Sequence, residues 1–172
     1  VVVEAVRRAT AVPIEVHMMV EKPDDTAIQY AKAGADIITL HIEGLTKTEE
    51  TLAAIRAEGS RAHLAISPGT PVSFVEPFLG SCSGVLVMSV EPGFGGQAFQ
   101  SSAIDKIQKL NKIRTSTGHD FCIGVDGGIS TKTIASVANA GADLIVAGSA
   151  IIRQTDYAEA LRELETLARK SK

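Results

Sequence analysis

The stretches V-M-S-V-E-P-G-F-G-G-Q at Val87–Gln97 and V-D-G-G-I at Val125–Ile129 decide the predicted fold. Each begins as a short β-branched run and ends in glycines, and V-A-G-S-A at Val146–Ala150 has the same form. Such a run is typical of a buried parallel strand, and the glycines let backbone N–H groups approach a bound anion closely. The three strand ends therefore predict a phosphate pocket, with the acid Asp126 beside it.

Outward from these stretches, strands and helices alternate along the chain. Apolar periodicity, glycines that stop helices and prolines that start them set the boundaries. The expected strands are 14–20, 36–43, 62–67, 84–90, 121–126 and 143–148. The expected helices are 1–10, 23–33, 46–58, 101–115, 131–139 and 157–170, with a short helix beginning near residue 71.

This alternation predicts an α/β fold with a parallel sheet. The segment A-G-A-D-I-I at 33–38 resembles A-G-A-D-L-I at 140–145, as a repeated strand–helix unit would. A doubly wound sheet usually has G-x-G-x-x-G after its first strand, and none occurs at the start of this chain. Polar residues instead follow most strands, which favours a (β/α)₈ TIM barrel with six of its eight strand–helix units present.

Composition limits the classes of function. The chain has 172 residues, 45% of them hydrophobic and 22% charged, which predicts one core and a single domain over 1–172. A net charge of −3 without a basic patch argues against a nucleic-acid partner. No apolar run approaches the roughly 20 residues of a membrane span, and no signal peptide is visible, so we expect no membrane partner and a cytoplasmic location. Cys82 and Cys122 have no metal-site spacing, and a disulfide framework is not expected.

Strand periodicity selects the candidates for chemistry. His17 shares a strand face with Glu15 and Met19, and Asp126 ends a later strand. If these faces point into the barrel, an imidazole and a carboxylate meet at its mouth and suit zinc, manganese or iron. Taken alone, His17 fits a hydrogen-bonded core histidine better than a ligand. Asp126 followed by two glycines fits a functional carboxylate better than a structural cap.

Other candidates remain open between two interpretations. Met19 and Met88 are either ordinary core residues or an apolar lid beside a reacting carbon. His41 and Glu43 either contact a substrate or solvate a strand end. The phosphate prediction rests on glycines and one serine: Gly93, Gly95, Gly96, Gly127, Gly128, Gly148 and Ser149.

From Val1 to about Lys170 the chain resembles the ribulose-phosphate 3-epimerase family. The resemblance is carried by the three strand ends quoted above, by V-H-M-M-V at Val16–Val20 and by A-G-A-D-I-I-T-L-H-I-E at Ala33–Glu43. It implies a (β/α)₈ barrel that interconverts D-ribulose 5-phosphate and D-xylulose 5-phosphate by metal-assisted proton transfer through an enediolate. It also implies a sugar-phosphate ligand and a homo-oligomer.

The same resemblance implies roles for individual residues. His17 and Asp126 would be ligands of one divalent ion, which is zinc, manganese, iron or cobalt, and Asp126 would also be one of two proton-transfer acids. The implied substrate-binding residues are His17, Met19, Met88, Gly93, Phe94, Gly95, Gly96, Asp126, Gly127, Gly128, Gly148 and Ser149.

The chain also departs from the family pattern. Family members begin with two strand–helix units that find no match here, so we expect an N-terminally incomplete barrel holding strands three to eight. Their second strand carries a His-x-Asp motif with two more metal ligands and the other acid, and no H-x-D occurs in this sequence. We therefore expect these 172 residues alone to be inactive.

Two other functions remain open. One is a D-allulose-6-phosphate 3-epimerase, which Gly95, Gly96 and the run Gly127–Ile129 disfavour, because those relatives tend to have alanine or Ser-Cys there. The other is a non-catalytic barrel fragment that binds a phosphate ester.

Overall fold

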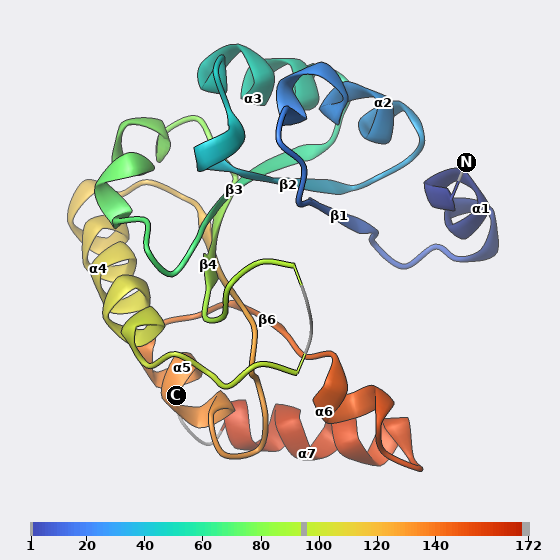
Figure 1. Ribbon diagram of the computed structural model, residues 1–172, viewed down its shortest axis with the longest axis vertical. Coiled ribbons are helices and arrows are strands. Elements are labelled where there is room, and N and C mark those ends of the chain that lie inside the picture. Colours follow the sequence, from blue (N-terminus) through green and yellow to red (C-terminus); the bar gives the residue numbers. More distant parts are fainter. Residues whose placement is uncertain (1, 94–95, 170–172) are drawn as a thin grey trace.

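A parallel sheet curls into part of a barrel in the computed structural model, which describes residues 2–93 and 96–169 (Figure 1). The order of the strands in the sheet is their order in the chain, and every neighbouring pair is parallel. The predicted α/β class is thus confirmed as a six-stranded half-barrel. Its strands are β1 (Glu15–Met18), β2 (Ile37–His41), β3 (Arg61–Ile66), β4 (Gly84–Met88), β5 (Cys122–Asp126) and β6 (Leu144–Val146).

Helices cover the convex side of the sheet, while α1 stands apart beyond β1 (Figure 1). No helix within the described ranges is long and apolar enough to cross a bilayer. The α-helices are α1 (Val2–Ala9), α2 (Ala27–Lys32), α3 (Thr48–Ala57), α4 (Ser102–Thr117), α5 (Ile134–Ala140), α6 (Ser149–Ile152) and α7 (Tyr157–Arg169). The 3₁₀ turns are η1 (Pro23–Asp25), η2 (Ile42–Gly44), η3 (Val72–Phe74) and η4 (Glu76–Phe78).

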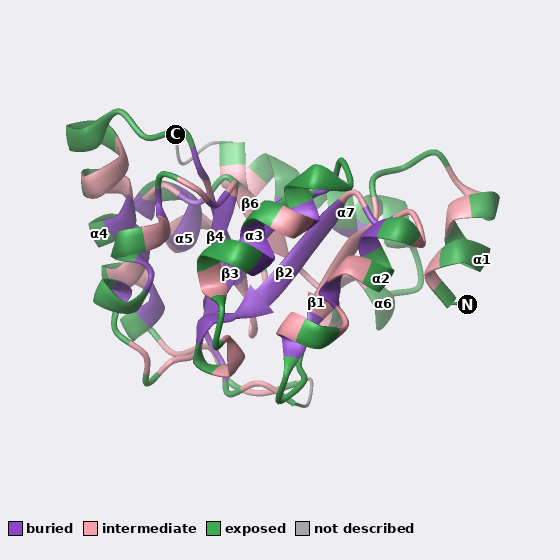
Figure 2. Ribbon diagram, turned by 90° about the horizontal axis from the view of Figure 1, so that it is seen from above, coloured by how far each residue is buried: buried purple, intermediate pink, exposed green. Residues whose placement is uncertain are grey.

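Alternation along the strands produces two layers of side chains. Leu64 and Val125 point toward the helices and belong to the main core. Leu86 and Met88 point to the concave side, where they form a smaller cluster. Figure 2 shows the central strands buried and the helices exposed on their outer surfaces. Functional side chains must therefore come from the concave positions or from the loops.

The aspartates of the two A-G-A-D segments make equivalent contacts. Asp36, just before β2, accepts a hydrogen bond from a backbone N–H near the start of β1 and pairs with Arg7. Asp143, just before β6, accepts one from a backbone N–H near the start of β5 and pairs with Arg114. Each aspartate thus ties a strand to its neighbour at the amino-terminal end of the sheet, which confirms the predicted repeat.

The structure differs locally from the expected elements. The short helix expected near residue 71 is present in 3₁₀ form as η3 and η4, and Pro77 inside η4 has no N–H to continue a longer helix. The strand expected to reach Glu43 ends at His41, because the chain enters the turn η2. The helix α6 was not expected, since four residues are too few to show a helical period.

Candidate functional site

A cavity of about 460 Å³ lies where β4, β5 and β6 end. Its volume is in the range of small-molecule sites. Of the predicted site residues, Phe94 and Gly95 lie outside the described residues. His17 does not line the cavity but lies next to Asp126, which does. All the other predicted site residues line it: Met19, Met88, Gly93, Gly96, Asp126, Gly127, Gly128, Gly148 and Ser149.

The Gly127–Gly128 turn brings the backbone to the cavity wall. Both residues have positive φ, at 117° and 60°, a conformation that side chains disfavour. A Cβ on Gly127 would lie 2.4 Å from the side chain of Val90, and one on Gly128 would lie 2.6 Å from the backbone nitrogen of Phe99. Only glycine fits at either position, so the strand-end signal in the sequence has a steric cause.

His17 and Asp126 meet across the concave side, although their strands β1 and β5 are not neighbours in the sheet. The Nδ1 atom of His17 lies 3.7 Å from Oδ2 of Asp126, and the side chains are 15% and 24% exposed. This separation is longer than a hydrogen bond. A divalent ion bonds to imidazole nitrogen and carboxylate oxygen at about 2.0–2.2 Å, so the two atoms fit part of one coordination shell. Within the described residues no cluster of three or more potential ligands converges.

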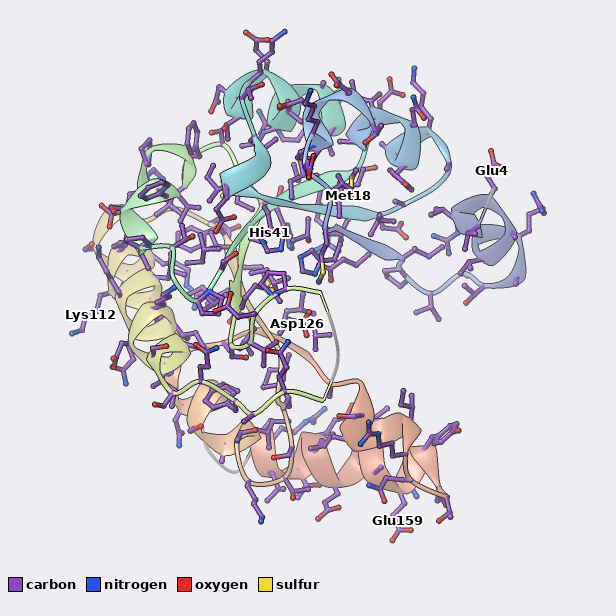
Figure 3. The ribbon with its side chains drawn as sticks, viewed as in Figure 1. Glu4, Met18, His41, Lys112, Asp126 and Glu159 are labelled. Carbon is purple, nitrogen blue, oxygen red and sulfur yellow. The ribbon has the colours of Figure 1, made fainter. Side chains whose placement is uncertain are left out.

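His41 lies beside His17 on the concave side of the sheet, the side that also carries Asp126 (Figure 3). Its Nε2 lies 3.0 Å from Nε2 of His17, and its Nδ1 lies 3.3 Å from Oε2 of Glu43. Burial, and secondly the neighbouring ring of His17, lower the pKa of His41, which favours the neutral ring. His41 is only 8% exposed, so it does not solvate the strand end. It does not line the main cavity, but together with Glu43 and Met19 it lines a smaller hollow beside it.

The loop after β3 holds the carboxylate of Glu43. Its Oε1 accepts hydrogen bonds from the N–H of Ser67 and the hydroxyl of Thr70. Burial raises the pKa of this carboxyl, but these hydrogen bonds outweigh it and leave the pKa below its usual value. Glu43 is therefore an ionised group with a defined position beside His41.

The two methionines differ. Met88 is 1% exposed and belongs to the concave apolar cluster as well as to the cavity wall. Met19 is 48% exposed at the rim of the same cavity. Met19 is therefore not a core residue, whereas Met88 is both a core residue and part of the apolar wall of the cavity.

Sequence reasoning missed Arg153. It lies one turn after Ser149, and its guanidinium Nη2 is 3.7 Å from the point where a Cβ on Gly96 would lie. It lines the cavity and makes no ion pair with a described residue. Only an expected helix at α6 would have pointed to it. The remaining wall residues not singled out earlier are Val90, Glu91, Pro92, Gln97, Ile129, Val146 and Ile152.

Solved structures share the architecture. KGPDC from Streptococcus mutans superposes with a TM-score of 0.78 at 17% identity, covering 98% of this chain and 78% of that one. A 3-hexulose-6-phosphate synthase superposes with a TM-score of 0.73 at 23% identity, covering 96% and 79%. At this level of identity the likeness concerns the fold alone.

Sequence relatives extend the likeness to the family. The chain is 41% identical to the ribulose-phosphate 3-epimerase of Bacillus subtilis over 95% of its own length and 76% of that protein. It is 39% identical to a chloroplastic enzyme of the same name from Arabidopsis thaliana, over 98% of this chain and 60% of that one. The sequence model described as "Ribulose-phosphate 3 epimerase family" matches residues 1–152. The chain therefore belongs to the ribulose-phosphate 3-epimerase family of enzymes.

Proposed function

We propose that the cavity binds a pentose phosphate and serves its epimerisation at C3, which interconverts D-ribulose 5-phosphate and D-xylulose 5-phosphate. One observation carries the proposal: the carboxylate of Asp126 lines the same cavity as the glycine loops after β5 and β6. A ligand with its phosphate on those loops would extend along the wall that carries Asp126. Relatives named ribulose-phosphate 3-epimerase, at about 40% identity, support this substrate.

The phosphate end of the proposed site combines backbone and side-chain donors. Gly127, Gly128 and Gly148 expose backbone to the cavity, and Ser149 adds a hydroxyl. Arg153 supplies a cation that can form charge-assisted hydrogen bonds to phosphate oxygens. In this proposal the glycines and Ser149 place the phosphate, and Arg153 neutralises part of its charge.

The reacting end is the part near Asp126. Its carboxylate would take the proton from C3, or return it, on one side of the sugar. Met88 and Met19 would limit the access of water to that carbon. Inversion needs a second acid on the opposite side, and the family resemblance places it in a His-x-Asp motif that these 172 residues do not contain.

His17 and Asp126 are the residues that would hold a divalent ion. Their 3.7 Å separation and their donor types fit that role. The ion, when bound, would polarise the ketone of the substrate and so acidify the proton on C3. His17 would serve as a ligand only, while Asp126 would be both a ligand and the proton-transfer acid.

The test measures the conversion of D-ribulose 5-phosphate by ¹H NMR in two polypeptides. One is residues 1–172 alone. The other, the complemented chain, joins them to the first two strand–helix units of the Bacillus subtilis relative. We expect conversion by the complemented chain and none by residues 1–172 alone. Inactivity of a folded complemented chain, or preference for D-allulose 6-phosphate, contradicts the proposal. Phosphate-ester binding without conversion in both supports the non-catalytic alternative.

A substitution tests the phosphate end in the same assay. We expect Arg153→Gln in the complemented chain to raise KM by roughly tenfold, with a smaller change in kcat, because one charge-assisted hydrogen bond is lost. Arg162→Gln on α7, outside the cavity, is the matched control. An unchanged KM in Arg153→Gln removes Arg153 from the proposed site. The expected homo-oligomer, cytoplasmic location and position as strands three to eight of a barrel remain predictions.

A further inference from the structure

We propose that Glu43 and His41 form a positioning relay for His17, which holds the His17 ring with its Nδ1 lone pair directed toward Asp126. The inference rests on the proposed function, because it assigns the residues that prepare the proposed metal ligand. Neither Glu43 nor His41 lines the main cavity; both line a smaller hollow that shares Met19, Pro92 and Gly93 with it. In this proposal their contribution is made through His17.

Three contacts in series carry the inference. Oε2 of Glu43 lies 3.3 Å from Nδ1 of His41, Nε2 of His41 lies 3.0 Å from Nε2 of His17, and Nδ1 of His17 lies 3.7 Å from Oδ2 of Asp126. The two rings are inclined by only 14°, with centroids 5.0 Å apart. Both nitrogens of His41 and Nε2 of His17 thus lie within hydrogen-bond distance of a partner, and Nδ1 of His17 faces Asp126 at a longer distance.

The chemistry of the groups orders the hydrogens along this series. A carboxylate can only accept, and a neutral imidazole has one N–H and one acceptor nitrogen. We assign the hydrogen of His41 to Nδ1, where it donates to the carboxylate of Glu43 and the hydroxyl oxygen of Ser67 lies 3.4 Å from the same nitrogen; Nε2 is then an acceptor. His17 must then donate from Nε2, which leaves Nδ1 unprotonated and facing Asp126. An unprotonated imidazole nitrogen is the form that binds a metal, and such ligands commonly donate their other N–H to a protein group.

The relay has a rigid support. Glu43 is held at its other oxygen by the loop that follows β3. Lys106 from α4 fixes that loop, donating to the carbonyl oxygens of Ser67, Pro68 and Thr70 at 2.8, 2.8 and 2.7 Å. His41 itself is 8% exposed at the end of β2. The orientation of His17 would therefore be set by a connected part of the fold rather than by a mobile side chain.

The first test follows Co²⁺ binding to the purified chain by the paramagnetic shifts of its imidazole protons. We expect His41→Leu to weaken Co²⁺ binding by roughly 10- to 100-fold, the usual effect of removing such a partner. His41→Gln should recover part of the loss, because its amide oxygen can accept from Nε2 of His17. Thr39→Val is the control: Thr39 is a fully buried polar residue on the same face of β2, bonded to Glu15, and its loss should change affinity by less than about threefold.

The outcomes separate the relay from the proposed function. Equal Co²⁺ affinity in wild type and in a folded His41→Leu variant overturns the relay and leaves the metal site standing. An equal loss in Thr39→Val and His41→Leu also overturns it, because the effect would then come from general disturbance of β2. If Co²⁺ shifts no imidazole proton resonance of the wild-type chain, the metal site and the relay are both overturned. Turnover by the complemented chain is decided in a separate assay.

The second test needs no metal. Long-range ¹H–¹⁵N spectra of the imidazoles identify which nitrogen carries the hydrogen. The relay requires Nε2–H on His17 and Nδ1–H on His41. Nδ1–H on His17 in the metal-free protein overturns the inference. Far-UV circular dichroism of each variant establishes that the fold is retained, so a changed tautomer or affinity cannot be attributed to unfolding.

Discussion

The two ends of the sheet use aspartate in opposite ways. At the amino-terminal end, Asp36 and Asp143 each accept hydrogen bonds from a backbone N–H and pair with an arginine. At the carboxyl-terminal end, the carboxylate of Asp126 accepts no hydrogen bond from the described residues and faces His17 at 3.7 Å. A carboxylate whose partners are all within the protein stabilises the fold, whereas one directed at a cavity without such partners is available to a ligand.

The glycines differ between the two ends as well. The glycines of the A-G-A-D repeat turn the chain from a helix into a strand and make room for the side chains of Arg7 and Asn111. Gly127 and Gly128 at the carboxyl-terminal end bring backbone to the wall of a cavity. The same residue types thus stabilise one end and prepare a ligand site at the other, as in barrels whose catalytic groups follow the strands.

The largest expected effect comes from Asp126→Asn. In the complemented chain we expect turnover of D-ribulose 5-phosphate to fall by about 10²- to 10⁴-fold, because one acid–base group is lost. The free energy of unfolding should change by less than about 0.5 kcal/mol, since the carboxylate has no structural hydrogen bond among the described residues. Turnover assays and urea unfolding measure the two quantities. A large loss of stability would contradict the contrast between the two ends.

A second prediction concerns the loss of stability at low pH, which we expect to come from His63 on β3 rather than from either end of the sheet. Burial, and secondly Arg61, lower the pKa of His63 from 6.5 to about 4, and its Nε2 has no described partner. The unfolded chain therefore binds a proton more readily, so stability is fully present above pH 6.5 and falls as the pH drops to about 4. The loss is about 3 kcal/mol.

Urea unfolding of wild type and His63→Leu at about pH 7.5 and about pH 4.5 measures this dependence. The variant should lose much less stability with acid than the wild type. A parallel decline in both would assign the acid sensitivity to the carboxylates at the ends of the sheet instead.

The smallest effect is expected at the amino-terminal end. Asp143→Ala removes the contacts to Arg114 and to the backbone of β5, and we expect a loss of about 1–2 kcal/mol of stability. Co²⁺ affinity of the folded protein should stay at the wild-type value. Asp120→Ala, an exposed aspartate nearby, is the control for urea unfolding. A weakened metal site in folded Asp143→Ala would mean that the two ends are coupled.

Sequence reasoning succeeded where the information is local. Gly127 and Gly128 follow a buried strand, and their steric requirement is visible in the order of residues. Arg153 was missed because α6 is too short to show a period. Glu43 was assigned to a strand end, but the turn η2 redirects its side chain to His41.

Periodicity and glycine placement by themselves determined the parallel α/β fold, the repeat and the strand that ends in Asp126, because each depends on neighbours along the chain. The sequence predicted that His17 meets Asp126 only if both strand faces point into a barrel; the tertiary structure decided it, since the curl of the sheet joins strands that do not pair. It also decided that His41 links Glu43 to His17 and that Arg153 reaches the cavity. Contacts across a barrel depend on curvature and register, which no local pattern of residues contains.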